Sequence, residues 1–205
     1  MSGTHTTAQS MASHRAITKV VAAVEQEGAK VVGIAELFAG SGASLIARSI
    51  AGAYDRFGKK ALLVEANALD ISSENAEPKI DASLDFTSAI QTVSDRFFTA
   101  NLAEMEGAGV LARRHFREAF DRLQATDLEV VVDLPSVYTQ SGELNMALPA
   151  IGAACEVVFL VCETAHVNRL QMADAIEFFH SSNINLAGLV MNDQRLFFNQ
   201  FLTDS

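Results

Sequence analysis

The sequence predicts an α/β fold: a doubly wound, mainly parallel β-sheet flanked by helices. Two observations predict it. Five short apolar segments alternate along the chain with stretches in which apolar residues recur at helical spacing. The apolar segments also lack the alternation of a half-exposed strand, so we expect strands that are buried on both faces. Helical connections between buried strands imply that neighbouring strands are parallel.

The elements are expected in a regular order. The five predicted strands are the most apolar short segments: Val31–Ala35, Ala61–Val64, Leu128–Asp133, Glu156–Cys162 and Ala187–Met191. The predicted helices have apolar residues three or four positions apart: about Ser13–Glu27, Ser44–Phe57 (with Ile46, Ile50, Ala53 and Phe57 on one face), a stretch with Phe116, Phe120 and Leu123, Gly142–Ala153 and Leu170–Phe179. Residues 67–101 are expected to form loops around a short helix near Leu84–Val93.

Length and charge limit the classes of function. The 205 residues suit one domain, which we place at 14–205 after a disordered polar tail at 1–13. The net charge of −10 argues against binding to nucleic acid and to anionic membrane surfaces. Cys155 and Cys162 flank an apolar run, so we expect buried thiols and a reducing cytoplasmic compartment.

The segment after the first predicted strand has the order of a phosphate-binding loop. In such loops a strand, a glycine-rich turn and a helix place backbone N–H groups around an anion. Against the pattern G-x-x-x-x-G-K-[ST], Gly42 and Ser44 are present, whereas Leu37 and Ala43 replace the first Gly and the Lys. Taken alone, this loop also fits a tight turn that binds nothing.

Four segments together resemble a family. The loop Ala39–Ser44 is similar to P-G-E-G-K-S, Lys59–Asn67 to G-K-K-V-L-L-I-D-A-D, and Asp127–Val137 to Y-D-x-V-I-I-D-T-P-P-V; Gly188–Asn192 is similar to a late strand ending in Asn. In this order they resemble the bacterial tyrosine kinases of capsule and exopolysaccharide assembly, a branch of the MinD/ParA-type P-loop ATPases. The resemblance extends over residues 31–193, nearly the whole chain.

The resemblance implies roles for particular residues. It assigns nucleotide binding to the loop and to the late strand: Gly40, Ser41, Gly42, Ala43, Ser44 and Asn192. It assigns a weak Mg²⁺ site to Ser44 and Asp133, and catalysis, if the chain is active, to Asp133 and Glu65. No cofactor is expected to be required, and the resemblance leaves room only for weak binding of ATP or ADP with Mg²⁺.

Several family features are replaced. Ala43 stands where the catalytic Lys is expected, and Phe38 where the deviant loop has a second Lys. Glu65 and Asn67 replace the two Asp residues of the second signature. A Tyr-rich tail and the E-x-x-R-x-x-R helix are missing from the sequence.

These departures predict a pseudo-enzyme. We expect a cytoplasmic regulatory or scaffolding partner in exopolysaccharide or capsule biosynthesis and export. Its partner would be a membrane polysaccharide co-polymerase or export protein, which would hold it at the inner face of the membrane. A homodimer is compatible with the resemblance. The alternative is an active, divergent MinD/ParA-type ATPase that dimerises with nucleotide.

Two further features leave alternatives open. Of the five His residues, only His166 follows a predicted strand on the ligand side of the sheet, and surface or capping roles are expected for the others. The apolar segment Leu196–Leu202 fits docking on the core, contact with a hydrophobic partner, or membrane binding, in that order.

Overall fold

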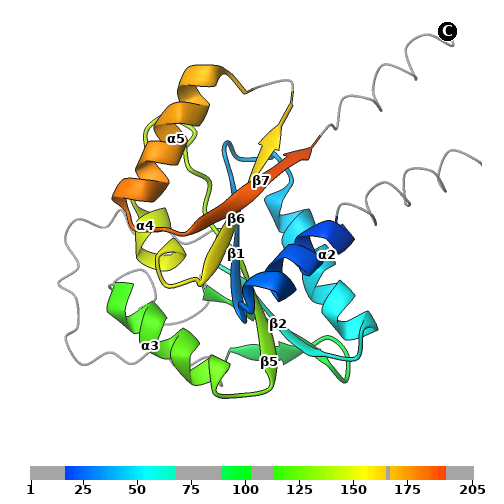
Figure 1. Ribbon diagram of the computed structural model, residues 1–205. Coiled ribbons are helices and arrows are strands. Elements are labelled where there is room, and N and C mark those ends of the chain that lie inside the picture. The colour runs from blue at the N-terminus through cyan, green and yellow to red at the C-terminus, as the bar shows by residue number, and fades with distance from the viewer. Residues whose placement is uncertain (1–16, 68–88, 103–112, 165–166, 193–205) are drawn as a thin grey trace, which may run out of the picture.

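The computed structural model describes residues 17–67, 89–102, 113–164 and 167–192. Its centre is a seven-stranded sheet in the order β3-β4-β2-β5-β1-β6-β7 (Figure 1). A helix over residues 17–27 precedes the first strand. The other elements are β1 (Val31–Glu36), α2 (Ala43–Arg56), β2 (Lys60–Glu65), β3 (Ile90–Thr92), β4 (Phe97–Asn101), α3 (Arg113–Gln124), β5 (Leu128–Asp133), α4 (Ala147–Gly152), β6 (Val157–Glu163), α5 (Arg169–Ser181) and β7 (Leu186–Asn192). The predicted α/β fold is confirmed.

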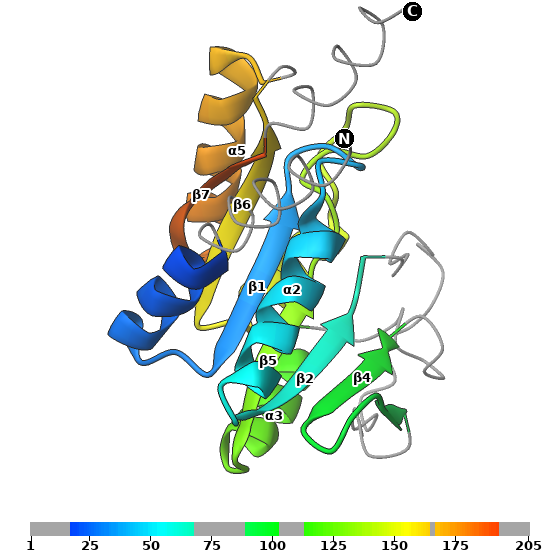
Figure 2. The same ribbon diagram turned by 90° about the vertical axis from the view of Figure 1, so that its right-hand side faces the viewer.

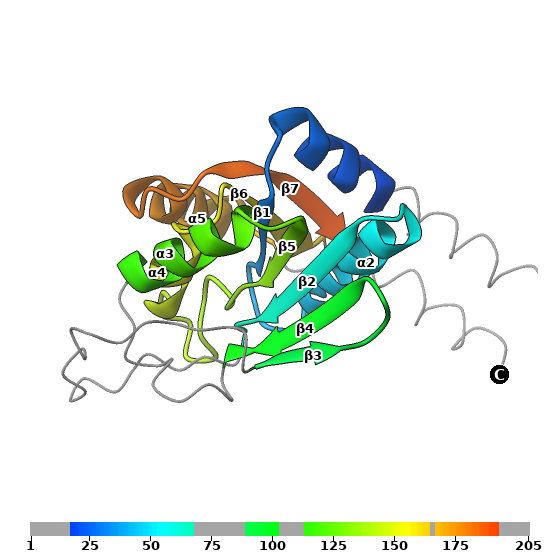
Figure 3. The same cartoon turned by 90° about the horizontal axis from the view of Figure 1, so that it is seen from below.

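The sheet separates two helical layers. All strand pairs are parallel except β3 with β4, which is antiparallel. The helix over 17–27 and α2 cover one face, and α3, α4 and α5 cover the other (Figures 2 and 3). Each layer buries its own apolar cluster against the sheet, as a doubly wound fold requires.

Strand β1 lies between β5 and β6 in the sheet and shows why both faces are apolar. Val31 and Ala35 belong to the cluster beneath α3 and α5, whereas Val32 and Ile34 belong to the cluster beneath α2. Successive side chains of a strand point to opposite faces, so a strand covered on both sides must be continuously apolar. A Cβ on Gly33 would lie 2.6 Å from Leu134 Cδ1, so this position accepts only glycine without rearrangement.

The structure corrects four expectations. Residues Ile90–Thr92 form the edge strand β3 rather than part of a helix, and β4 was not predicted. The last strand is not buried on both faces: β7 alternates between half-buried and exposed residues because it lies at the sheet edge. Phe57 is 56% exposed, since α2 ends at Arg56 and Phe57 caps it rather than joining its buried face.

The remaining sequence expectations fall partly outside the described residues. These include the tail at 1–13, residues 84–88 of the proposed short helix, His166, and Leu196–Leu202. Cys155 and Cys162 are buried free thiols, as predicted, and burial raises the pKa of the Cys162 thiol to about 11. None of the helices within the described ranges has both the length and the hydropathy to cross a bilayer.

Candidate functional site

The carboxyl edge of the sheet is acidic. The four adjacent strands β2, β5, β1 and β6 end on Glu65, Asp133, Glu36 and Glu163, respectively. Because parallel strands end at the same edge, these four residues share the edge at which doubly wound folds bind ligands. The phosphate-loop candidate connects β1 to α2 at this edge (Figure 2).

The loop is a tight turn that requires its glycines. Gly40 and Gly42 have φ values of 93° and 99°, in the left-handed region that residues with a Cβ rarely adopt. Ser41 is buried, and both its backbone N–H (3.2 Å) and its Oγ (2.8 Å) donate to the Phe38 carbonyl. Ala43, at the position of the expected Lys, is the first residue of α2 and is 1% exposed.

An acidic side chain fills the centre of this turn. The Glu36 Oε1 accepts a hydrogen bond from Gly40 N at 3.2 Å, and its Oε2 accepts from Gly42 N at 3.1 Å and Ala43 N at 3.4 Å. The N-cap residue of α2, Gly42, makes no side-chain cap, and the first turn of the helix has no acidic residue. Glu36 therefore supplies from β1 the negative charge that a helix N-terminus favours.

Asp133 also lies beside the loop but, unlike Glu36, it has a carboxylate oxygen without a hydrogen bond. Its side chain is 3% exposed, and its Oδ1 has no hydrogen-bond partner among the described residues. Burial raises the pKa of Asp133 to about 6, a hydrogen bond from Ser44 opposes the rise, and the charges of Glu36 and Glu65 add to it. A carboxylate with an unused oxygen, next to the second residue of α2, is a group suited to a cation or a proton.

Two polar contacts hold other candidate residues in place. Glu65 Oε1 is 2.6 Å from Arg48 Nη2, an ion pair in which the Arg48 side chain is 64% exposed. Asn67 Nδ2 donates to Ser44 Oγ at 3.0 Å.

Asn192 connects the end of β7 to the loop. Its Nδ2 donates to the Ser41 carbonyl at 2.7 Å. The contact joins residues from distant parts of the sequence and holds the turn against the last strand. Ser41 is thus fixed both through its own donors and through its carbonyl.

A cavity of about 430 Å³ lies beside the loop. Its lining comes from the turn and from the region after β6: Phe38, Ala39, Gly40, Ser41, Glu163 and Val167. The Phe38 ring stacks on Tyr138, with centroids 5.2 Å apart, and this stack supports the loop from the side of the segment after β5. The Glu163 carboxylate gives the cavity wall a negative charge.

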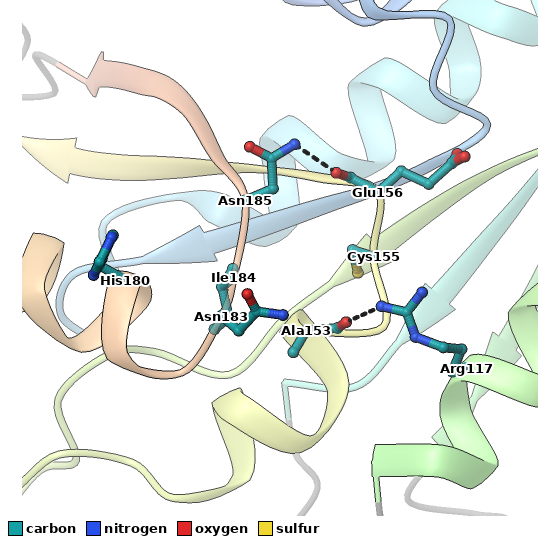
Figure 4. Close-up of a pocket in the computed structure, with 8 residues that line it drawn as sticks. All are labelled: Arg117, Ala153, Cys155, Glu156, His180, Asn183, Ile184 and Asn185. Carbon is teal, nitrogen blue, oxygen red and sulfur yellow. Dashed lines mark hydrogen bonds between the residues drawn. The ribbon is translucent and has the colours of Figure 1, made fainter.

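A second cavity, of about 580 Å³, lies at the opposite edge, where β6 and β7 begin (Figure 4). Its polar groups bind one another: Arg117 Nη2 donates to the Ala153 carbonyl at 2.6 Å, and Asn185 Nδ2 to the Glu156 carbonyl at 2.8 Å. The Glu156 Oε2 accepts from the backbone N–H of Val31 at 2.9 Å. These contacts hold the strand starts together.

The structure brings the predicted loop residues together, but the side chain that binds the loop was not among the predicted residues. The predicted loop residues do lie together, and Ser44 and Asp133 lie side by side as the resemblance implied. Glu36 and Arg48 were not predicted. The signal for Glu36 was an acidic residue at the end of an apolar strand, directly before the loop.

Comparisons with known proteins show the fold. No protein-family model and no curated protein matches the sequence. Among solved structures, the chain is similar to the BceF tyrosine kinase domain, with a TM-score of 0.62, 16% identity, and coverage of 86% of this chain and 74% of that one.

Two further structures have the same fold. The kinase domain of the Escherichia coli tyrosine kinase ETK has a TM-score of 0.61 and 14% identity, and the match covers 80% of this chain and 67% of that one. The MinD cell division protein of Aquifex aeolicus has a TM-score of 0.58 and 15% identity, with 84% and 72% covered. The chain thus has the P-loop NTPase fold shared by bacterial tyrosine kinase domains and MinD-type ATPases.

The residues present fit only part of a nucleotide–Mg²⁺ complex. Mg²⁺ is held in such sites by one or two oxygen side chains together with phosphates and water, and Ser44 with the unused Asp133 Oδ1 provides such oxygens. The phosphates do not fit, because the backbone donors that would receive them already bind Glu36. Within the described ranges, no group of three or more His, Cys, Asp or Glu residues is placed to hold a metal ion.

Proposed function

We propose that this protein is a catalytically degenerate relative of the polysaccharide-assembly tyrosine kinases, acting as a regulatory or scaffolding partner. Under this proposal the protein has the kinase-like fold but does not catalyse phosphoryl transfer. It is carried by one observation: at the start of α2, where the fold needs a lysine, stands Ala43, which is 1% exposed.

The charge balance of this edge opposes catalysis. Phosphoryl transfer in this fold depends on a lysine and a metal ion that neutralise charge developing on the phosphates. A charge-assisted contact is worth about 1.5–3 kcal/mol, or roughly one to two decades of affinity. Here Arg48 is paired with Glu65 instead, and each added carboxylate repels a polyphosphate.

The proposed partner is a membrane co-polymerase or export protein for surface polysaccharide. Support comes from the sequence resemblance and from the kinase domains that share the fold. Recruitment through this partner would place the chain at the cytoplasmic face of the membrane.

Genetic complementation tests the proposal. Deletion of the gene should lower surface polysaccharide, and Asp133→Ala should restore it as well as the wild-type gene does, because no catalytic carboxylate is needed. A core variant such as Leu62→Asp serves as the unfolded control. An Asp133→Ala protein that accumulates normally but fails to restore polysaccharide would contradict the proposal, as would an unchanged polysaccharide level in the deletion strain.

The alternative function is an active, divergent ATPase that dimerises with nucleotide. The unused Asp133 Oδ1 beside Ser44 favours this alternative, since the two side chains provide the oxygens that would bind Mg²⁺. This alternative predicts a doubled mass by light scattering when ATP and Mg²⁺ are added. An unchanged mass counts against it.

A further inference from the structure

The N–H groups of Gly40, Gly42 and Ala43 converge at the start of α2, where a P-loop would hold phosphate. We propose that Glu36 is an internal anion that occupies this cradle and holds it closed to phosphate. The inference concerns the same loop as the proposed function and rests on that function, which takes the loop to be a phosphate-binding loop that has lost its catalytic role. It adds a named side chain that blocks the site.

The carboxylate uses both oxygens in the cradle. Oε1 faces Gly40 N, and Oε2 is shared by Gly42 N and Ala43 N, at distances from 3.1 to 3.4 Å. Two oxygens on one centre, bound by N–H groups of the loop, the N-cap and the first residue of the helix, resemble two phosphate oxygens held at a helix N-terminus. The first turn of the helix has no acidic residue of its own, so the carboxylate bound to its first N–H groups comes from Glu36 on β1.

The backbone of Glu36 is fixed, which gives the carboxylate an advantage over a free anion. Glu36 ends β1, between β5 and β6. Its carbonyl accepts from Val137 N at 2.8 Å, and the next residue, Leu37, donates to the Val161 carbonyl at 2.9 Å. A group tethered this close binds intramolecularly, so a phosphate must compete with a high effective concentration of carboxylate.

The neighbouring half of the site is intact. Asp133 is 3% exposed with an unpartnered Oδ1, and it lies beside Ser44 and within the electrostatic influence of Glu36. An unused buried oxygen is costly unless something binds it, so this half is built for a ligand that the filled cradle keeps out.

Calorimetric titration with Mg²⁺ and inorganic pyrophosphate tests the inference. The variants are Glu36→Gln and Glu36→Ala, and the matched control is Glu177→Gln, which removes the same charge from an exposed side chain of α5 outside the site. We expect both Glu36 variants to bind the probe about tenfold or more tightly than the wild type, because a charged competitor is removed. The control should stay within about twofold of the wild type.

The outcomes separate this inference from the proposed function. Equal affinity of the wild type and folded Glu36 variants, or no binding by either variant, overturns the closed cradle and leaves the proposed function standing. A Glu36 variant that binds pyrophosphate without hydrolysing ATP supports both. A Glu36 variant that hydrolyses ATP supports the closed cradle and overturns the proposed loss of catalysis. Circular dichroism confirms that each variant is folded.

Discussion

At the scale of single residues, two carboxylates on adjacent strands lie at the same loop but differ in how far their oxygens are hydrogen-bonded. Glu36 has both oxygens bound by backbone donors, whereas Asp133 is buried with one oxygen unused. Burial therefore raises the pKa of Asp133 to about 6. The difference follows from geometry: Glu36 reaches the open end of a helix, and Asp133 faces other acids and a single hydroxyl.

The raised pKa makes stability depend on pH. The folded state holds the Asp133 proton more tightly than the unfolded chain does, so this contribution is greatest below about pH 4 and is lost as the pH rises through about 6. The variant Asp133→Asn has no titratable group at this position and serves as the reference. Relative to it, the wild type should lose on the order of 1 kcal/mol of unfolding free energy between about pH 5.5 and about pH 8.

Urea unfolding of both proteins with chelator present measures this difference. Chelation removes divalent cations that would bind the carboxylate and hide its titration. Parallel stability–pH curves for the wild type and Asp133→Asn would contradict the raised pKa and, with it, the description of Asp133 as a buried and incompletely satisfied group.

At the scale of elements, what the sequence predicted depends on how each strand is covered. The central strands were predicted because burial on both faces makes them continuously apolar. Strand β3, at one edge of the sheet, and its neighbour β4 were not predicted, since β3 has three residues, two of them exposed, and β4 mixes polar and half-buried residues. Glu36 was not predicted as a ligand of the loop, because an acid at a strand end does not reveal which way its side chain turns.

Close packing of β1 gives a prediction for this element. Gly33→Ala would place a Cβ 2.6 Å from Leu134 Cδ1 and 3.0 Å from Val158 Cγ2, so the core must shift. We expect a loss of about 1–3 kcal/mol in unfolding free energy, measured by urea denaturation.

A second glycine provides the matched control. In Gly52→Ala, on α2, the nearest atom to the new Cβ is Arg56 Nη1 at 3.6 Å, which is an ordinary contact. This variant should gain about 0.5–1 kcal/mol from the better helix propensity of alanine. Equal stability of Gly33→Ala and the wild type would show that β1 is less tightly packed than described.

At the scale of the whole molecule, the acidic site edge agrees with a net charge of −10. The fold is that of bacterial tyrosine kinase domains and MinD-type ATPases. The side-chain charge expected at the loop is reversed, because Ala43 stands at the position of the expected lysine and the Glu36 carboxylate binds the loop N–H groups. A positive loop attracts phosphates; here backbone N–H groups supply the positive end of the helix, and the chain itself neutralises them. This reversal is the basis for proposing a partner protein rather than an enzyme.

The most direct test of this account is phosphate release from ATP with Mg²⁺ by the purified wild-type protein, with Asp133→Ala measured in parallel. We expect both proteins to release phosphate at the rate of the protein-free control, because the loop has no lysine and the Glu36 carboxylate binds its N–H groups. Hydrolysis by the wild type that disappears in folded Asp133→Ala would contradict it and establish the chain as an active ATPase.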